Sequence, residues 1–283
     1  MNQILKLSVL VLLSLPIAAL AQLKGDTYAQ TQQTKTATWV IAHANSPGLA
    51  ETDASGKQPT GLCFDLMNAF AAYVKTKTGI AVTMKYQTEN ANDFAGYLSQ
   101  IKSAKGGVFG LSNTTITAER KKSYNFSPPY IKNISMILSH PSVPELTALD
   151  KIATTFVGVT AVAVKGSTNE ARILSLKAKY YPAMQIEYVS SFSQVIDRVA
   201  SDPKTFCDID FTYYLKGLQA GKKTKRHAIG DKPDEEFGII MPLSNDWSPL
   251  MTEFMTSFTA GSEYNKVVTK HLGQSVLQFI KKG

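Results

Sequence analysis

Arg120 is the residue whose type and surroundings most favour binding chemistry. A guanidinium presents a rigid planar fork of donors that matches a carboxylate in bidentate geometry. Thr115 lies five residues earlier and Asn113 seven, so hydroxyl and amide groups precede the arginine on a short segment. Lys121 and Lys122 follow directly, and such a basic run is also typical of an exposed surface. The segment therefore predicts either an anion-binding site or an ordinary solvated turn.

A second segment with similar chemistry surrounds Gly166. Ser167 and Thr168 follow this glycine and directly precede a predicted helix. We expect Thr168 to cap that helix, because hydroxyl side chains satisfy the free N–H groups of a first turn. The remaining N–H groups attract anions. Capping and anion binding use different donors, so the two segments together could clamp one carboxylate from opposite sides.

The elements that must position these residues alternate between strands and helices. Short apolar runs rich in β-branched residues predict strands, and apolar residues at helical spacing predict helices. We expect strands at 38–42, 81–86, 108–111, 156–159, 184–189 and 206–211, and helices at 64–79, 94–101, 170–178, 192–200 and within 249–280. This order predicts two α/β units, each with a mostly parallel sheet and flanking helices.

The composition indicates a globular protein. The chain has 283 residues, of which 44% are hydrophobic and 18% charged, enough for a core and unlike a disordered chain. The formal net charge is +8, and part of the excess lies in residues 222–226. This run predicts a solvated surface turn or a contact patch for an acidic membrane surface or a transporter subunit. No nucleic-acid-binding motif accompanies it, so we expect no nucleic acid partner.

The N-terminus has the pattern of a secretory signal peptide. Lys6 precedes an almost wholly apolar run at 7–20, and small residues ending at Ala21 form a cleavage site. The apolar run is short for a membrane-spanning helix. We therefore expect cleavage after Ala21 and a soluble mature chain in the periplasm. Its first residues, 22–36, are polar and predict a flexible leader.

Three segments together resemble the amino-acid family of bacterial periplasmic solute-binding proteins. Residues 61–66 look like the family's Gly-Phe-Asp-x-Asp-Leu helix start, without the first acidic residue. Residues 112–130 are similar to its Thr-Ile-Thr-x-x-Arg stretch and the following Phe-Ser-x-Pro-Tyr. Residues 164–170 are similar to its Gly-Ser/Thr-Thr turn, and 261–273 match more weakly. The order and spacing fit nearly all of the expected mature chain.

The resemblance implies a two-lobed fold of periplasmic binding protein type II, with lobes joined by two hinge strands. The first lobe would comprise residues 37–134 plus 238–283, and the second 135–237. The hinge strands would lie near 134–136 and 237–240. It also implies a binding protein of an ABC-type transporter that closes on an amino-acid-like or small carboxylate ligand. Its partners would be membrane permease subunits, and we expect a monomer.

The family's site residues carry over with one departure. By the resemblance, Arg120 holds the ligand's α-carboxylate together with Thr115. Asn113 lies where the family uses a backbone carbonyl to accept a hydrogen bond from the ligand's ammonium. In the family an Asp on the second lobe pairs with this ammonium, five residues after the position that matches Asp208. In this sequence that position is occupied by Tyr213. A phenol cannot neutralise an ammonium, so a carboxylate ligand without a free amine, or with a modified one, is favoured. The predicted ligand-binding residues are Arg120, Thr115, Asn113, Ser167, Thr168 and Tyr213.

Catalytic and metal-binding motifs are not indicated. The sequence has no zinc spacing, phosphate loop or nucleophile elbow, so we predict no enzyme activity, cofactor or metal. A disulfide between Cys63 and Cys207 is possible in an oxidising compartment. Because it would lock the two predicted lobes together, two buried free thiols are favoured.

Two alternatives remain open for the function. Enzymes such as dehydratases are built on the same fold, and Glu170 is the candidate proton donor near the Gly166 turn. Alternatively, the chain is a ligand-sensing module that contacts a membrane partner directly.

Overall fold

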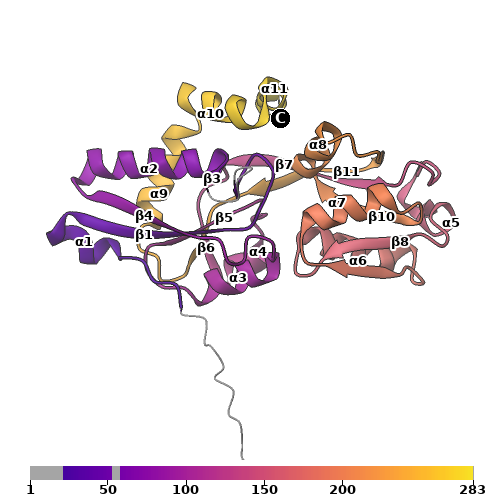
Figure 1. The fold of residues 1–283 in the computed structure, drawn as a ribbon, viewed down its shortest axis with the longest axis horizontal. Coiled ribbons are helices and arrows are strands. Elements are labelled where there is room, and N and C mark those ends of the chain that lie inside the picture. The colour runs from indigo at the N-terminus through magenta and orange to yellow at the C-terminus, as the bar shows by residue number, and fades with distance from the viewer. Residues whose placement is uncertain (1–21, 53–57, 283) are drawn as a thin grey trace, which may run out of the picture.

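The computed structural model describes residues 22–52 and 58–282, with side chains to residue 278, and consists of two α/β lobes (Figure 1). The predicted signal peptide, residues 1–21, lies outside the described residues. Within those residues, no helix combines the length and the hydropathy that a bilayer span requires.

The first lobe is built around a five-stranded sheet in the order β4-β1-β5-β12-β6. Strand β1 (Thr36–His43) pairs in parallel with β4 (Ala81–Gln87) and with the central strand β5 (Val108–Leu111). Strand β12 (Ile240–Pro242) runs antiparallel to β5 and to β6 (Tyr124–Phe126). The chain therefore returns to this lobe after it has built the second one.

Helices cover both faces of this first sheet, with α2 on one side and α3 on the other (Figure 1). The core is aromatic: the buried Trp39 stacks on Phe70 at 4.9 Å and meets Trp247 edge-on at 5.1 Å. The helices of this lobe that follow β1 are α2 (Leu62–Thr78), α3 (Phe94–Ser103), α4 (Ala118–Lys121), α9 (Ser248–Phe258), α10 (Ser262–Leu272) and α11 (Gln274–Lys282). A short hairpin of β2 (Glu51–Thr52) and β3 (Pro59–Thr60) lies beside α2.

The segment at 22–36, expected to be a flexible leader, instead contains a helix, α1 (Tyr28–Thr34). A capping box starts it, because Thr27 accepts from the N–H of Gln30 and the Gln30 side chain accepts from that of Thr27. The carboxylate of Asp246 accepts from the N–H of Tyr28 at 2.7 Å. The leader is thus a structural part of the first lobe.

The second lobe has a sheet in the order β11-β7-β10-β8-β9. Its strands are β7 (Ile131–Ser139), β8 (Thr160–Val164), β9 (Ile186–Val189), β10 (Thr205–Asp210) and β11 (Lys225–Phe237). Strands β8, β9 and β10 are parallel, whereas β7 and β11 add antiparallel pairs. Both sheets are therefore mixed rather than mostly parallel, since the chain reverses direction where it crosses between lobes.

Helices flank the second sheet, with α6 and α7 on either side of β8 (Figure 1). They are α5 (Ile152–Thr155), α6 (Thr168–Tyr180), α7 (Phe192–Ser201) and α8 (Phe211–Gln219), preceded by the single-turn η1 (Leu149–Lys151). No strand forms at 156–159, because Gly158 turns the chain at φ +72° and β8 begins only at Thr160. Cys63 on α2 and Cys207 on β10 are buried and free, as expected.

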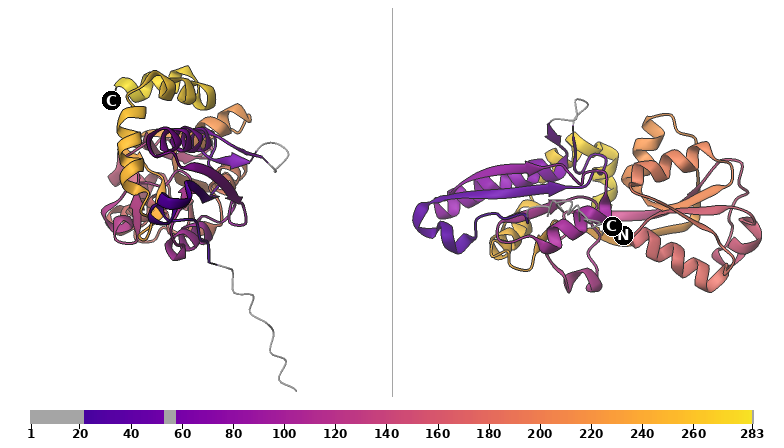
Figure 2. Two further views of the ribbon diagram at one scale, coloured as in Figure 1. Left: turned by 90° about the vertical axis from the view of Figure 1, so that its left-hand side faces the viewer. Right: turned by 60° about the horizontal axis from the view of Figure 1, so that its bottom comes forward.

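Strands β7 and β11 run from one lobe to the other (Figure 2). Residues 131–133 of β7 pair with 235–237 of β11, while 135–139 pair with β10 in the second sheet. The N–H of Gly238, just after β11, donates to the carbonyl of Thr114 at 3.1 Å. The connecting strands thus touch the segment that leads to Arg120. The lobe limits at residues 134/135 and 237/238, and the hinge positions near them, stay predictions.

Candidate functional site

Arg120 lies on α4 and reaches across to the second lobe. Thr117 begins this short helix by accepting from the N–H of Arg120 at 3.1 Å. The guanidinium donates from Nη1 to the carbonyl of Thr115 at 3.0 Å and from Nη2 to that of Gly166 at 3.2 Å. It also lies 5.7 Å from the ring of Phe94. The side chain is therefore fixed at the meeting of the lobes and not on a solvated turn.

The charge of Arg120 has no contacting counter-ion. In the described part of the chain, no carboxylate lies within 4.0 Å of its guanidinium. Burial lowers the pKa of Arg120, because desolvation disfavours the charged form. A desolvated cation with only carbonyl partners is an electrostatically favourable position for an anion.

Thr115 and Thr168 meet across the lobes, with their hydroxyl oxygens 3.1 Å apart. Thr168 is the first residue of α6, but the cap is Ser167, whose hydroxyl accepts from the N–H of Glu170 at 2.9 Å. The expectation that Thr168 caps the helix is therefore wrong by one residue. The consequence is that the Thr168 hydroxyl is free to face the first lobe.

A cavity of about 380 Å³ opens beside this pair of threonines. Its walls come from the Thr115 segment, from α6 and from the end of β11, and they include the basic Arg172 and Lys232 and the acidic Glu235. The volume lies in the range of small-molecule sites. The cavity is bounded by both lobes, and of the six predicted residues it is lined by Thr115 and Thr168.

Asn113 contacts the second lobe through Asp210, which lies outside the predicted set. Both side chains are buried, and the Asn113 amide donates to Oδ2 of Asp210. Oδ1 of the same carboxylate accepts from Asn133 at 2.8 Å and from Asn169 at 3.3 Å. Burial, reinforced by Glu235 and opposed by these amide donors, raises the pKa of Asp210 to about 7.

Tyr213 is buried where α8 approaches the first lobe. Its hydroxyl donates to the carbonyl of Asn45 at 2.6 Å, and burial raises its pKa well above the ordinary range. Its ring lies 5.2 Å from Phe192, which in turn meets Phe94 edge-on at 5.3 Å. The phenol therefore contributes an interlobe hydrogen bond and an aromatic contact, and brings no negative charge to this position.

The structure thus brings the six predicted residues to one interface. Arg120, Thr115, Asn113, Thr168 and Tyr213 each make a direct contact between lobes, and Ser167 caps the helix that carries Thr168. Sequence reasoning missed the polar atoms of the same interface that come from other segments. They are the carboxylate of Asp210 and the amides of Asn133 and Asn169 that donate to it.

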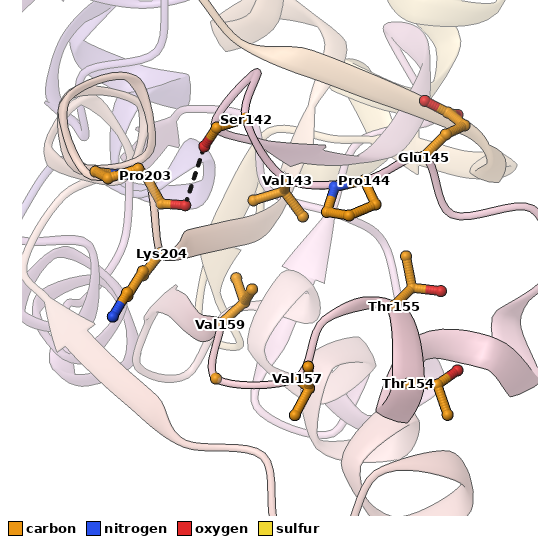
Figure 3. Close-up of a pocket in the computed structure, with 11 residues that line it drawn as sticks. Ser142, Val143, Pro144, Glu145, Thr154, Thr155, Val157, Val159, Pro203 and Lys204 are labelled. Atoms are coloured by element: carbon orange, nitrogen blue, oxygen red, sulfur yellow. Dashed lines mark hydrogen bonds between the residues drawn. The ribbon is translucent and has the colours of Figure 1, made fainter.

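A second cavity lies far from these residues, at the outer end of the second lobe beside α5 (Figure 1). Its volume is about 660 Å³, and Figure 3 shows its wall of Val143, Pro144, Val157 and Val159 with Ser142 donating to the carbonyl of Pro203. It shares no residue with the interlobe site. Size alone does not make it the ligand site, because the convergent polar groups lie between the lobes.

Two α/β lobes that meet at a polar interface are the architecture of a two-lobed binding protein, and the comparison with known families agrees. The chain belongs to the bacterial extracellular solute-binding proteins, family 3, whose model matches residues 39–274.

Solved structures support the same architecture. An ancestral arginine-binding protein bound to arginine superposes with a TM-score of 0.67 at 20% identity, covering 83% of this chain and 98% of that one. An ABC uptake transporter substrate-binding protein from Streptococcus pneumoniae with bound histidine gives a TM-score of 0.68 at 17% identity, covering 89% and 98%. At these identities the likeness establishes the fold.

A relative of different function matches part of the chain. Membrane-bound lytic murein transglycosylase F of Pseudomonas fluorescens is 27% identical over 158 residues, which is 56% of this chain. The match spans only 29% of that protein's length. The two proteins therefore share a segment of the binding fold.

Proposed function

We propose that this chain is the periplasmic substrate-binding protein of an ABC-type transporter, and that it binds an amino-acid-like or other small carboxylate ligand between its lobes. The observation that carries the proposal is Arg120, a partly buried cation with no carboxylate within 4.0 Å among the described residues, close to Thr115 and Thr168 from opposite lobes. A carboxylate placed there would exchange two carbonyl contacts for charge-assisted bonds. Export by the predicted signal peptide and delivery to permease subunits belong to the same proposal.

Ligand capture in this proposal depends on lobe closure. The contacts Arg120–Gly166, Thr115–Thr168, Asn113–Asp210 and Tyr213–Asn45 all join the lobes, so they exist together only in a closed form. A ligand that contacts both lobes shifts the equilibrium towards that form by its differential affinity. The strands β7 and β11 are the elements about which the lobes would move.

The enzyme alternative has less support. The carboxylate of Glu170, the candidate proton donor, accepts a hydrogen bond from the N–H of Gly166 at 2.6 Å. It therefore stabilises the turn before α6, which is a structural role. The partial match to a lytic murein transglycosylase gives the enzyme alternative weak support, because it covers only 29% of that protein's length. A ligand-sensing module is the other candidate, and it would bind its ligand at the same interlobe site.

A thermal-shift screen tests the proposed function. The mature chain is heated with L-arginine, L-glutamine, L-histidine, other amino acids and amine-free dicarboxylic acids. A ligand at about 100 times its Kd stabilises the native state by about 2.7 kcal/mol, which raises the midpoint measurably. If no small carboxylate shifts the midpoint at millimolar concentration, the proposal fails.

Tyr213 is expected to contribute to ligand affinity and to favour ligands without a free amine. Replacement of Tyr213 by phenylalanine removes the interlobe bond to Asn45 and retains the contact with Phe192. One such hydrogen bond contributes about 1 kcal/mol, so we expect about fivefold weaker binding with little change in stability without ligand.

Calorimetry with a ligand found in the screen measures this Tyr213 effect, and Tyr214→Phe on the same helix is the matched control. We expect amine-free acids to bind the unaltered protein better than the amino acids that correspond to them. Preference for the free amine, or equal losses in the two variants, would contradict this interpretation.

A further inference from the structure

Three acidic side chains are buried where the connecting strands meet the second lobe. Asp208 and Asp210 are 2% and 1% exposed on β10, and Glu235 is 7% exposed on β11. A buried carboxylate requires a cation, hydrogen bonds or a proton to offset its lost hydration. The three acids differ in which of these they have.

Asp208 and Glu235 both have cationic partners that do not depend on the first lobe. Arg172 donates from Nη1 to Oδ2 of Asp208 at 2.7 Å, and Asn169 donates to Oδ1 at 3.0 Å. The ammonium of Lys232 lies 3.4 Å from Glu235. Separation of the lobes leaves these ion pairs in place.

Asp210 has no such cation, and one of its three amide donors belongs to the other lobe. No Lys or Arg of the described residues lies within 4.0 Å of its carboxylate. Asn133 and Asn169 reach it from β7 and α6, but Asn113 reaches it from the end of β5. The charged and titratable groups around it are Glu235, Asp208, Arg120, Tyr130 and Tyr213.

We propose that Asp210 is a proton-binding site formed by lobe closure, so that the protein takes up a proton when it closes on a ligand. The proposal rests on the proposed function in one respect, namely that the lobes open and close. In the open form Asn113 is withdrawn and water reaches Oδ2, so the carboxylate is hydrated and its pKa falls towards the ordinary value of about 3.9. In the closed form the loss of this water outweighs the Asn113 bond, which favours the ionised carboxylate, and burial raises the pKa to about 7.

The direction of the pH dependence follows from this difference. Between about pH 4 and about pH 7 the closed form binds one proton more than the open form, so closure becomes less favourable as the pH rises. The equilibrium constant for closure falls by at most about tenfold per pH unit in this window. Below it both forms are protonated, above it both are ionised, and the dependence disappears.

Closure without ligand is measured by electron–electron distance spectroscopy on the mature protein. Spin labels are placed on cysteines that replace the exposed Lys102 of α3 and the exposed Ser201 of α7. The short-distance population should grow as the pH is lowered from 8 to 5. In Asp210→Asn, whose neutral amide needs no proton, the distribution should be independent of pH. Asp197→Asn, an exposed acid of the same lobe, should behave like the unaltered protein.

A direct titration covers the case in which Asp210→Asn does not fold. Carbon-13 labelling of the Asp carboxyl groups should reveal two resonances with raised pKa values under conditions in which the distances report the closed form, from Asp208 near 6 and from Asp210 near 7. Asp208→Asn removes the first and so identifies the second. The proposal is overturned if no resonance titrates above pH 5 in Asp208→Asn, or if Asp210→Asn keeps the pH dependence of closure. Since no ligand is used, these outcomes are independent of the thermal-shift screen.

Discussion

Replacement of Arg120 by methionine is expected to weaken ligand binding by about 30-fold to several-thousand-fold. This range corresponds to the about 2–5 kcal/mol lost when one partner of a buried charge pair is removed. Methionine retains much of the side-chain volume beside Phe94, so the loss reports the guanidinium and not a cavity. Binding is measured by calorimetry with a ligand identified in the thermal-shift screen.

The matched control for Arg120 is its neighbour on α4. Lys121 carries the same charge and is exposed, so Lys121→Met should leave affinity unchanged apart from a weak, salt-dependent effect. The thermal midpoint of each variant without ligand shows whether the fold is retained. If both variants lose affinity equally, the basic run acts through its general field and Arg120 is not a specific anchor.

Local patterns were sufficient to predict the longer helices and several of the central strands, because each of these elements buries its own apolar face. The helix at 28–34 was missed since the segment has no apolar period, although Thr27 and Gln30 carry the capping-box signature that starts it. The strand expected at 156–159 was displaced because Gly158 adopts a positive φ and Val157 is 74% exposed. Apolar composition alone could not distinguish this turn from the strand that follows it.

The interface residues that could be predicted lie on short segments with a recognisable pattern, at 113–120 and 167–168, or at a fixed offset from one, as Tyr213 does from Asp208. Thr115 and Arg120 are five residues apart, and the carbonyl of the first accepts from the guanidinium of the second. Asp210 was not predicted, because its amide partners come from β7, α6 and the end of β5. Such a cluster depends on the packing of distant elements, and no spacing in the sequence reports it.

Replacement of Arg172 by methionine is expected to destabilise the protein by about 3–5 kcal/mol at pH 7, since it leaves Asp208 buried without a cation. The Arg172 side chain is 15% exposed, and that of Asp208 is fully buried. The Arg172 guanidinium also donates to the carbonyl of Ser135 at 3.3 Å, so methionine removes a hydrogen-bonded link between α6 and β7. Urea unfolding at pH 7 and pH 4.5 measures the change.

The pH dependence distinguishes lost charge pairing from lost packing. Burial, partly opposed by Arg172, raises the pKa of Asp208 to about 6, above the unfolded value of about 3.9. This group therefore favours the native state most below pH 4, and its contribution falls as the pH rises to about 6. Without Arg172 the native pKa rises further, so the cost of the substitution should be largest at pH 7 and clearly smaller at pH 4.5.

Two further variants separate the possible causes. Arg172→Met combined with Asp208→Asn removes both charges and should recover much of the stability at pH 7, because no buried ion is left unpaired. Arg198→Met removes a guanidinium from an exposed pair with Glu187 and should change little. An equal loss at both pH values, or no recovery in the double variant, would mean that Arg172 acts through packing and backbone contacts.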